Sequence, residues 1–278
     1  MSACFDQFSA LHEISRHCRQ ILFSTHWYGF FPTIETGNAA VISKRDGEHH
    51  IDLINLSNHR EQVKQLNASS KGVLPYDIRL KSINDFVQSI ITSSMSSEPF
   101  NWLICEGSSE RIYFTKYFSD LVSSKKLRIV PVGGAKEIKR LYQHLAVSYE
   151  EFKSEIKGKI ILISDTDAEL VTYDTKSFPS LICKRIVNIP AKNDTALTQI
   201  SGNPVSPQTE IEDALNGRLF FETLLKFSDK FPSLEFLKEY NLSSESVSYF
   251  SLDLRDSERK KITAFFDNGN NKFLFAQE

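Results

Sequence analysis

Short apolar runs alternate with amphipathic segments between residues 100 and 190, and this alternation constrains the fold more than any other feature of the sequence. The apolar runs are rich in Ile, Leu and Val, which is typical of strands buried in a parallel sheet. The order of the segments predicts an α/β fold, a Rossmann-like parallel sheet flanked by helices with right-handed crossovers. We expect strands at 101–107, 127–134, 159–165 and 184–190, a helix at 109–122, and one long helix or two at 135–156.

Two further regions flank this central part, and we expect domains at 1–98 and 99–278. Before Pro99 the pattern predicts a small α/β segment and a linker helix, and after residue 190 it predicts a polar loop followed by a mainly helical C-terminal part. The N-terminal expectations are a helix at 6–18, strands at 20–25, 38–46 and 49–57, a polar stretch at 67–72 and a helix within 73–98; the polar loop spans 191–208.

The charge balance and the cysteines narrow the class of protein. Lys plus Arg number 33 and Asp plus Glu number 35, so no global basic field draws the chain onto nucleic acid, and any basic surface must be local. No apolar run is long enough to span a membrane, and the four cysteines lie far apart, as expected for reduced thiols in the cytoplasm.

Acidic residues stand where two of the predicted strands end. Glu106 ends the first strand, Gly133 and Gly134 end the second, and Asp165 and Asp167 end the third. The carboxyl ends of parallel strands share one edge of the sheet, which is where such folds bind ligands. Carboxylates gathered there would repel one another unless a cation neutralised them, and oxygen ligands suit Mg²⁺ or Mn²⁺. The sequence therefore predicts a metal site at this edge.

This arrangement of a glutamate, a glycine pair and an Asp-Thr-Asp motif on successive strands resembles the TOPRIM domain of topoisomerases, primases and several nucleases. It is most similar to the OLD (overcoming lysogenization defect) family of nucleases, because Glu110 follows Glu106 in the spacing of that family's paired glutamates. Two later motifs extend the resemblance, EIEDAL at 210–215 and KKITAFF at 260–266.

The resemblance implies a metal-dependent phosphodiesterase, a DNA endonuclease or nickase in anti-phage defence, with RNA as an alternative substrate. One or two Mg²⁺ or Mn²⁺ ions would bind among the five acidic residues Glu106, Glu110, Asp165, Asp167 and Glu212. Lys261 would stabilise negative charge in the transition state, and Glu106 could act as general acid or base. Glu210 and Lys260 are the alternative matches to the later acidic residue and to the lysine.

The N-terminal stretch CRQILFSTHWYGFFP resembles the strand and switch histidine, here His26, near the end of ABC-type ATPase domains. The sequence contains no GxxxxGK[ST] loop to hold phosphates, so we do not expect ATP hydrolysis by this chain. The resemblance implies a separate ATPase subunit as partner, or a homodimer. The alternative function is accordingly a partner-dependent or non-catalytic subunit that binds nucleic acid or protein.

Each motif also has an ordinary structural interpretation. Asp165 and Asp167 could cap a following segment, and acids such as Glu110 or Glu212 are common in the first turn of a helix. Lys261, with its lysine neighbour, could be a solvated surface residue. The correct order of the acids on successive strands favours the metal site over these interpretations.

Overall fold

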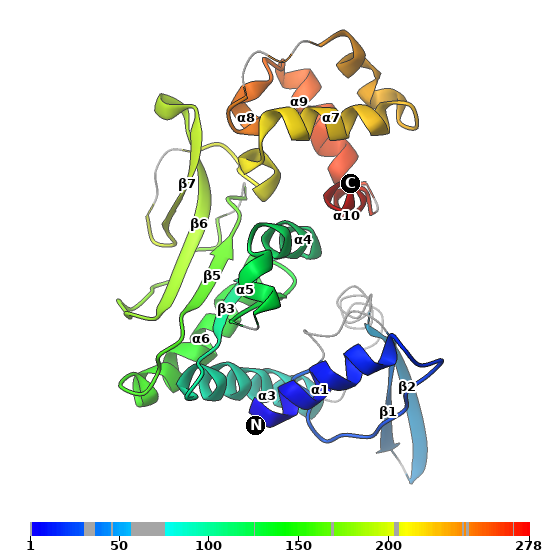
Figure 1. Cartoon of the computed structure of the whole chain (residues 1–278), viewed down its shortest axis with the longest axis vertical. Helices are drawn as coiled ribbons and strands as arrows, with labels where there is room; N and C mark the ends of the chain where they lie inside the picture. Colours follow the sequence, from blue (N-terminus) through cyan, green and yellow to red (C-terminus); the bar gives the residue numbers. More distant parts are fainter. Residues whose placement is uncertain are drawn as a thin grey trace. The chain divides into compact units, whose positions relative to one another are not determined.

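A five-stranded sheet forms the centre of residues 101–199 in the computed structural model, with the strand order β4-β3-β5-β6-β7. The sheet is mostly parallel and flanked by helices (Figure 1), so the predicted α/β class is confirmed. The strands are β3 (Asn101–Cys105), β4 (Leu127–Pro131), β5 (Ile160–Ser164), β6 (Leu181–Ile189) and β7 (Asp194–Gln199).

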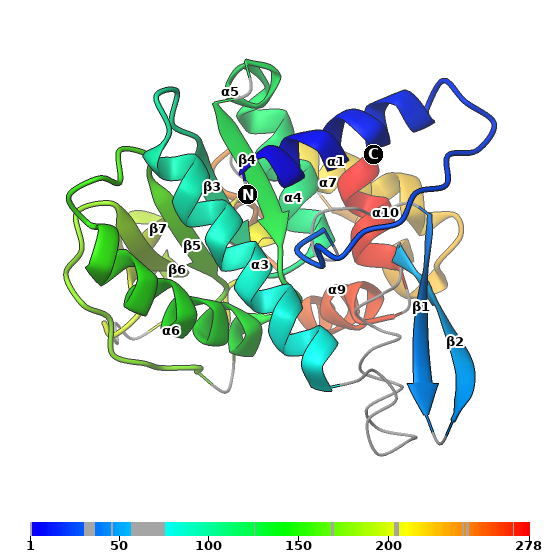
Figure 2. The same ribbon diagram turned by 90° about the horizontal axis from the view of Figure 1, so that it is seen from below.

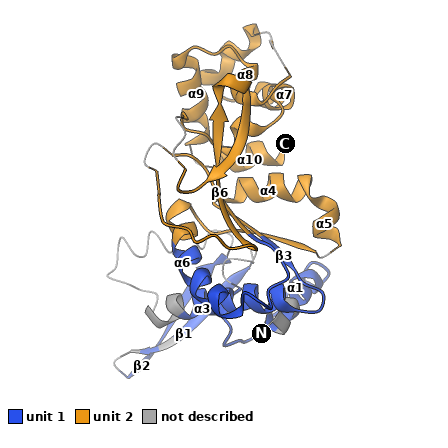
Figure 3. Cartoon of the chain, turned by 90° about the vertical axis from the view of Figure 1, so that its left-hand side faces the viewer, with its two compact units in different colours: residues 1–102, 140–160 blue, residues 103–139, 161–278 orange. Residues whose placement is uncertain are grey.

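The structure describes residues 2–30, 37–45, 47–56, 76–124, 126–167, 170–202, 206–240, 242, 245–268 and 270–278. The chain forms two compact units, which Figure 3 distinguishes by colour. The first unit comprises residues 1–102 and 140–160, and the second comprises 103–139 and 161–278. All the acidic residues of the predicted site belong to the second unit.

The first unit contains a β-hairpin, most of α6 (Ala135–Phe152) and two further helices, α1 (Ser2–Ser15) and α3 (Tyr76–Met95), which contact each other (Figure 2). Strands β1 (Asn38–Arg45) and β2 (Glu48–Asn55) lie where strands are predicted at 38–46 and 49–57, and they pair antiparallel. A small core joins the hairpin to the aromatic residues before it: Phe8, Trp27, Phe30, Val41 and Ile54.

The strand predicted at 20–25 is wrong, because these residues have no regular secondary structure. Leu22 in its centre is 92% exposed, so the segment has no sheet to bury its apolar side chains. His26, which follows it, is exposed, and its carbonyl accepts a hydrogen bond of 2.6 Å from the Lys81 Nζ. The polar stretch predicted at 67–72 lies outside the described residues.

Trp102 anchors the start of β3 to α3. The indole N–H donates to Ser93 Oγ at 3.0 Å, and the ring packs edge-to-face on Phe86 with centroids 5.8 Å apart. The backbone N–H of Trp102 donates to the Lys159 carbonyl at 2.8 Å, which aligns the beginnings of β3 and β5. The two strands that carry acidic residues at their other ends are therefore held in a defined register.

Helices make up most of the second unit outside the sheet, as predicted for the C-terminal part. The predicted helix 109–122 is interrupted at Phe118, and the predicted helix 135–156 is a single helix ending at Phe152. The helical segments are α4 (Ser108–Tyr117), α5 (Ser119–Ser123), α6 (Ala135–Phe152, with residues in both units), η2 (Pro190–Lys192), η3 (Ile211–Ala214), α7 (Gly217–Ser228), η4 (Pro232–Glu239), α8 (Ser248–Ser251), α9 (Asp256–Phe266) and α10 (Asn271–Gln277).

The polar loop predicted at 191–208 is wrong in part, because residues 194–199 form β7. This strand pairs antiparallel with β6 and lies at the end of the strand order, where a strand buries few side chains. Asn193 turns the chain between them in the left-handed conformation, with a φ of 50°. A polar composition predicts a loop, but an edge strand can be polar because much of it remains in contact with water.

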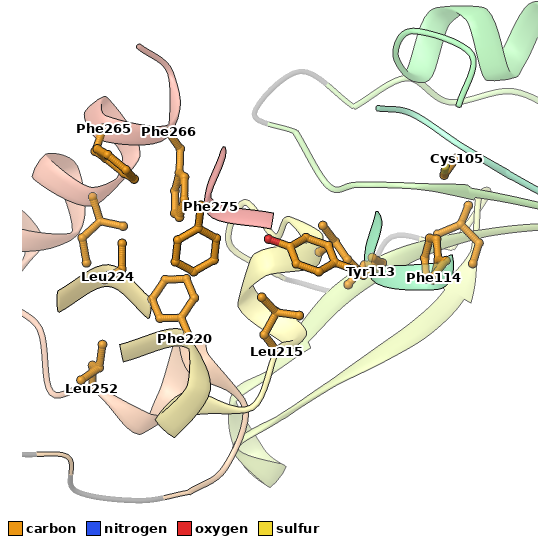
Figure 4. Close-up of a cluster of buried hydrophobic side chains, with 14 of the residues drawn as sticks. Cys105, Tyr113, Phe114, Leu215, Phe220, Leu224, Leu252, Phe265, Phe266 and Phe275 are labelled. Atoms are coloured by element: carbon orange, nitrogen blue, oxygen red, sulfur yellow. The ribbon is translucent and has the colours of Figure 1, made fainter. Parts of the chain in front are cut away.

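The core of the second unit is rich in phenylalanine. Phe220 of α7 packs on Phe266 of α9 and Phe275 of α10, and Tyr113 and Phe114 enter the same cluster from α4 (Figure 4). This cluster fixes α10 against α4 and so positions both helices beside the acidic residues. No helix in the described part of the chain has the length and apolar character that crossing a membrane requires.

Candidate active site

Glu106 follows β3 directly, and backbone groups of two neighbouring segments hold its carboxylate. Oε1 accepts a hydrogen bond of 2.9 Å from the backbone N–H of Asp165, which follows β5. The backbone N–H of Ala135, at the start of α6, also opposes the rise in the pKa of this carboxyl group. The side chain is thus fixed at the carboxyl edge of the sheet, close to the positive end of a helix dipole.

The glycine pair after β4 wraps around the backbone of Glu106. The N–H groups of Gly133 and Gly134 donate to the Glu106 carbonyl at 2.7 and 3.1 Å. Their φ values are 96° and 115°, a region that residues with a side chain rarely adopt. This turn brings the start of α6 to the Glu106 carboxylate.

A short bridge between Thr166 and Thr209 brings the later acidic segment to the same edge. Each residue donates its N–H to the carbonyl of the other, at 2.8 and 2.9 Å. Thr209 Oγ1 also accepts the N–H of Asn188 in β6 at 3.2 Å. Because Thr166 directly follows Asp165 and Thr209 lies shortly before Glu212, the bridge brings residues close together that are distant in the sequence.

Glu110 is buried in the first turn of α4, with an exposed fraction of 5%, so it is not a solvated residue. Its Oε1 accepts the N–H of Gly107 at 3.0 Å, and its Oε2 accepts the hydroxyl of Ser109 at 2.9 Å. The carboxylate therefore caps the helix and adds a negative charge next to Asp165, whose pKa it helps to raise.

Glu212 in η3 is 2% exposed and forms an ion pair with Lys272 of α10. The Lys272 Nζ lies 3.1 Å from Glu212 Oε2 and 3.2 Å from Glu210 Oε2. Neither carboxylate oxygen of Glu212 has a hydrogen-bond partner with good geometry. Buried carboxylate oxygens without hydrogen bonds are costly and mark a place where a cation or a polar ligand would be stabilised.

Three acids of the site, Glu106, Asp165 and Glu212, hold their protons more tightly than free carboxyl groups do. Burial, reinforced by Asp167 and Glu110, outweighs the hydrogen bond from Asp165 and raises the pKa of Glu106 to about 7. Burial also raises the pKa of Glu212 to about 7, although Lys272 opposes the shift. The pKa of Asp165 is raised for the same reason, with Glu110 as the next contributor. Asp167 itself is exposed.

Tyr113 and Asp213 are two residues of this region that sequence motifs did not single out. The buried Tyr113 hydroxyl lies next to Glu212 without the alignment of a hydrogen bond, and burial followed by that charge raises the Tyr113 pKa. Asp213 Oδ2 accepts the N–H of Glu210 at 2.8 Å, and burial raises the Asp213 pKa to about 6.

Lys272 occupies the position beside the carboxylates that the lysine motif led us to expect for Lys261. Lys261 is exposed on α9, and its Nζ lies 5.2 Å from the centre of the Phe236 ring. Among the described residues, neither Lys261 nor Lys260 forms an ion pair with the acids of the site. No motif surrounds Lys272, whose place depends on how α10 packs.

The acidic residues have the donor chemistry of a site for a hard divalent cation. Glu106, Asp165 and Glu212 offer carboxylate oxygens, and burial raises the pKa of each, so a nearby cation would favour their ionised forms. In the described residues no group of three such side chains is already arranged around a common ion position. A bound cation would therefore have to draw the carboxylates together.

Comparison of the chain with protein-family models, with curated proteins and with solved structures gives no match.

Proposed function

We propose that this chain is a metal-dependent phosphodiesterase of the TOPRIM type, a DNA endonuclease or nickase in anti-phage defence. The observation that supports the proposal is the convergence of Glu106, Glu110, Asp165 and Glu212 at the carboxyl edge of the sheet. The first three are the residues that the resemblance to the OLD nucleases selects near the first and third strands. Glu212 comes from a segment more than a hundred residues from Glu106 in the sequence and meets them through the threonine bridge.

A divalent cation at this edge would supply Lewis-acid stabilisation of the scissile phosphate and would lower the pKa of a bound water. Glu106 and Asp165 would hold it, with Asp167, whose charge acts on Glu106, as the further ligand that the resemblance implies. If Glu106 does not bind the cation, its carboxyl group, whose pKa burial raises to about 7, could instead act as general acid or base.

Lys272 would place a positive charge close to the phosphate. Burial alone would lower the pKa of Lys272, but the carboxylates of Glu212, Glu210, Asp165 and Glu110 outweigh burial and raise it. The ammonium therefore remains charged and can stabilise negative charge that develops on the phosphate oxygens.

Cleavage of supercoiled plasmid by the purified chain tests the proposal. With Mg²⁺ or Mn²⁺ we expect conversion to the nicked or linear form, and with EDTA we expect none. Glu106→Ala and Asp165→Ala should each lower the rate by at least a hundredfold, on the order of the loss seen when a catalytic group is removed. Glu239→Ala is the matched control, because Glu239 is an exposed glutamate of the same unit.

Circular dichroism of each variant shows whether its fold is retained. Full activity of both Glu106→Ala and Asp165→Ala would exclude this assignment. A single-stranded RNA substrate assayed in parallel tests the alternative substrate.

A second candidate function is a subunit that acts with a separate ATPase, and the hairpin of the first unit favours it. Ile42, Ile51 and Leu53 are each close to 70% exposed, and Ile42 and Ile51 are paired on neighbouring strands. Apolar side chains gathered on an exposed sheet face are typical of a contact surface for another protein. If the plasmid stays intact in every metal, restoration of cleavage by an added ATPase subunit would support this candidate.

A further inference from the structure

The ammonium of Lys272 lies between two carboxylates, in a position that a second divalent cation could otherwise occupy. Its Nζ is 3.1 Å from Glu212 Oε2 and 3.2 Å from Glu210 Oε2, so the ammonium sits between the two glutamates of the EIEDAL motif. Mg²⁺ would have to approach the same oxygens to about 2.0–2.1 Å. An ammonium and a metal ion cannot both occupy that space, and the electrostatic repulsion between them would be strong.

The packing of α10 keeps the ammonium in this place. Asn271, directly before Lys272, is buried, and its side-chain N–H donates to the Phe265 carbonyl at 3.0 Å. Phe275, one turn later, is 3% exposed and lies with its ring centroid 5.3 Å from that of Phe220. Residues on both sides of Lys272 are therefore held in the core. Withdrawal of the lysine would leave the Glu212 oxygens buried without a partner.

The opposite side of the site has no such internal cation among the described residues. The Glu106 carboxylate accepts the backbone N–H of Asp165 at 2.9 Å, and among the described residues it forms no ion pair with a lysine or arginine. The influence of Lys272 reaches Asp165, which lies between the two sides. Lys272 therefore supplies a positive charge beside Glu210 and Glu212, whereas no lysine or arginine of the described residues is paired with Glu106.

We propose that Lys272 takes the place of a second divalent cation, so that the site binds a single ion, on the side of Glu106, Asp165 and Asp167. This inference rests on the proposed metal-dependent function. Lys272 then neutralises Glu210 and Glu212 in place of a metal ion. Removal of its charge should open a second ion position between Glu210 and Glu212.

Counting bound Mn²⁺ on the full chain tests the inference without an activity assay. Isothermal titration calorimetry, checked by the electron paramagnetic resonance signal of free Mn²⁺, should give one ion per wild-type chain. Lys272→Met removes the charge and keeps an unbranched apolar stem, and it should bind two ions. Lys261→Met makes the same substitution on the exposed face of α9 and should still bind one.

The possible outcomes separate the inference from the proposed function. Two ions on the wild-type chain, together with metal-dependent plasmid cleavage, would overturn the inference and leave the proposed function standing. A folded Lys272→Met chain that still binds one ion would also overturn it. No Mn²⁺ binding to any variant would remove the proposed metal-dependent function as well. The wild-type count decides between one ion and two even if Lys272→Met does not fold.

Discussion

Replacement of Glu106 by glutamine should change how stability depends on pH, in a direction set by the burial of the carboxylate. In the folded chain burial and the neighbouring acids raise the pKa of Glu106 from 4.5 to about 7. The folded state then binds the proton more tightly than the unfolded state, so stability is highest below about pH 4.5 and falls as the pH rises to about 7. Each pKa unit corresponds to about 1.4 kcal/mol, so ionised Glu106 lowers the free energy of unfolding by about 3 kcal/mol at pH 8.

Urea denaturation in EDTA at pH 5 and pH 8 measures this effect. Far-UV circular dichroism is the suitable probe, because both tryptophans, Trp27 and Trp102, belong to the first unit and Glu106 belongs to the second. Relative to the wild type, Glu106→Gln should gain about 2–3 kcal/mol between pH 5 and pH 8. Comparing two pH values cancels the change in hydrogen bonding that glutamine introduces.

Glu239→Gln, the same substitution at an exposed position, should show a difference from the wild type that hardly changes with pH. A Glu106→Gln chain that gains less than about 1 kcal/mol, or that loses stability relative to the wild type at pH 8, would refute the account of a buried and crowded carboxylate.

Two glycines of the second unit should be intolerant of alanine for different reasons, and thermal unfolding measures both. At Gly217 an added Cβ would lie 1.9 Å from Ser251 Oγ. Gly217→Ala should therefore lower the free energy of unfolding by about 1–3 kcal/mol, through overpacking between α7 and α8. An unchanged melting temperature would contradict this close packing. At Gly134 a Cβ would meet no atom within 4 Å, but φ is 115°, so Gly134→Ala should cost about 1–3 kcal/mol through backbone strain alone. An unchanged melting temperature of this variant would contradict the strain.

The sequence predicts the regular part of the fold well, because the alternation of strands and helices is a local signal. The runs around 101–105, 127–131 and 160–164 are strands, as their β-branched and apolar composition indicates. The failures at 20–25 and 194–199 have one cause. Whether a segment becomes a strand depends on the presence of a partner strand, which composition alone does not reveal.

The sequence locates part of the candidate site for a related reason. Glu106 and Asp165 end strands, so the topology of a parallel sheet predicts that they meet, and they are linked by a hydrogen bond of 2.9 Å. Lys272 is positioned instead by the aromatic core around α10, a set of contacts among residues far apart in the sequence. A motif match selects Lys261, on the preceding helix, because matching by position does not take account of which face of a helix is buried.

A purely structural role does not account for the acids at the edge of the sheet. Helix α4 is capped by Glu110, so Glu106 is not needed for that purpose, and its ionisation at neutral pH lowers stability by about 3 kcal/mol. A ligand that binds only the folded chain stabilises the folded state. A cation between Glu106 and Asp165 would attract both carboxylates and so outweigh their mutual repulsion. Lys272 provides this compensation for Glu212, whereas no described lysine or arginine forms an ion pair with Glu106, so we expect the ion beside Glu106.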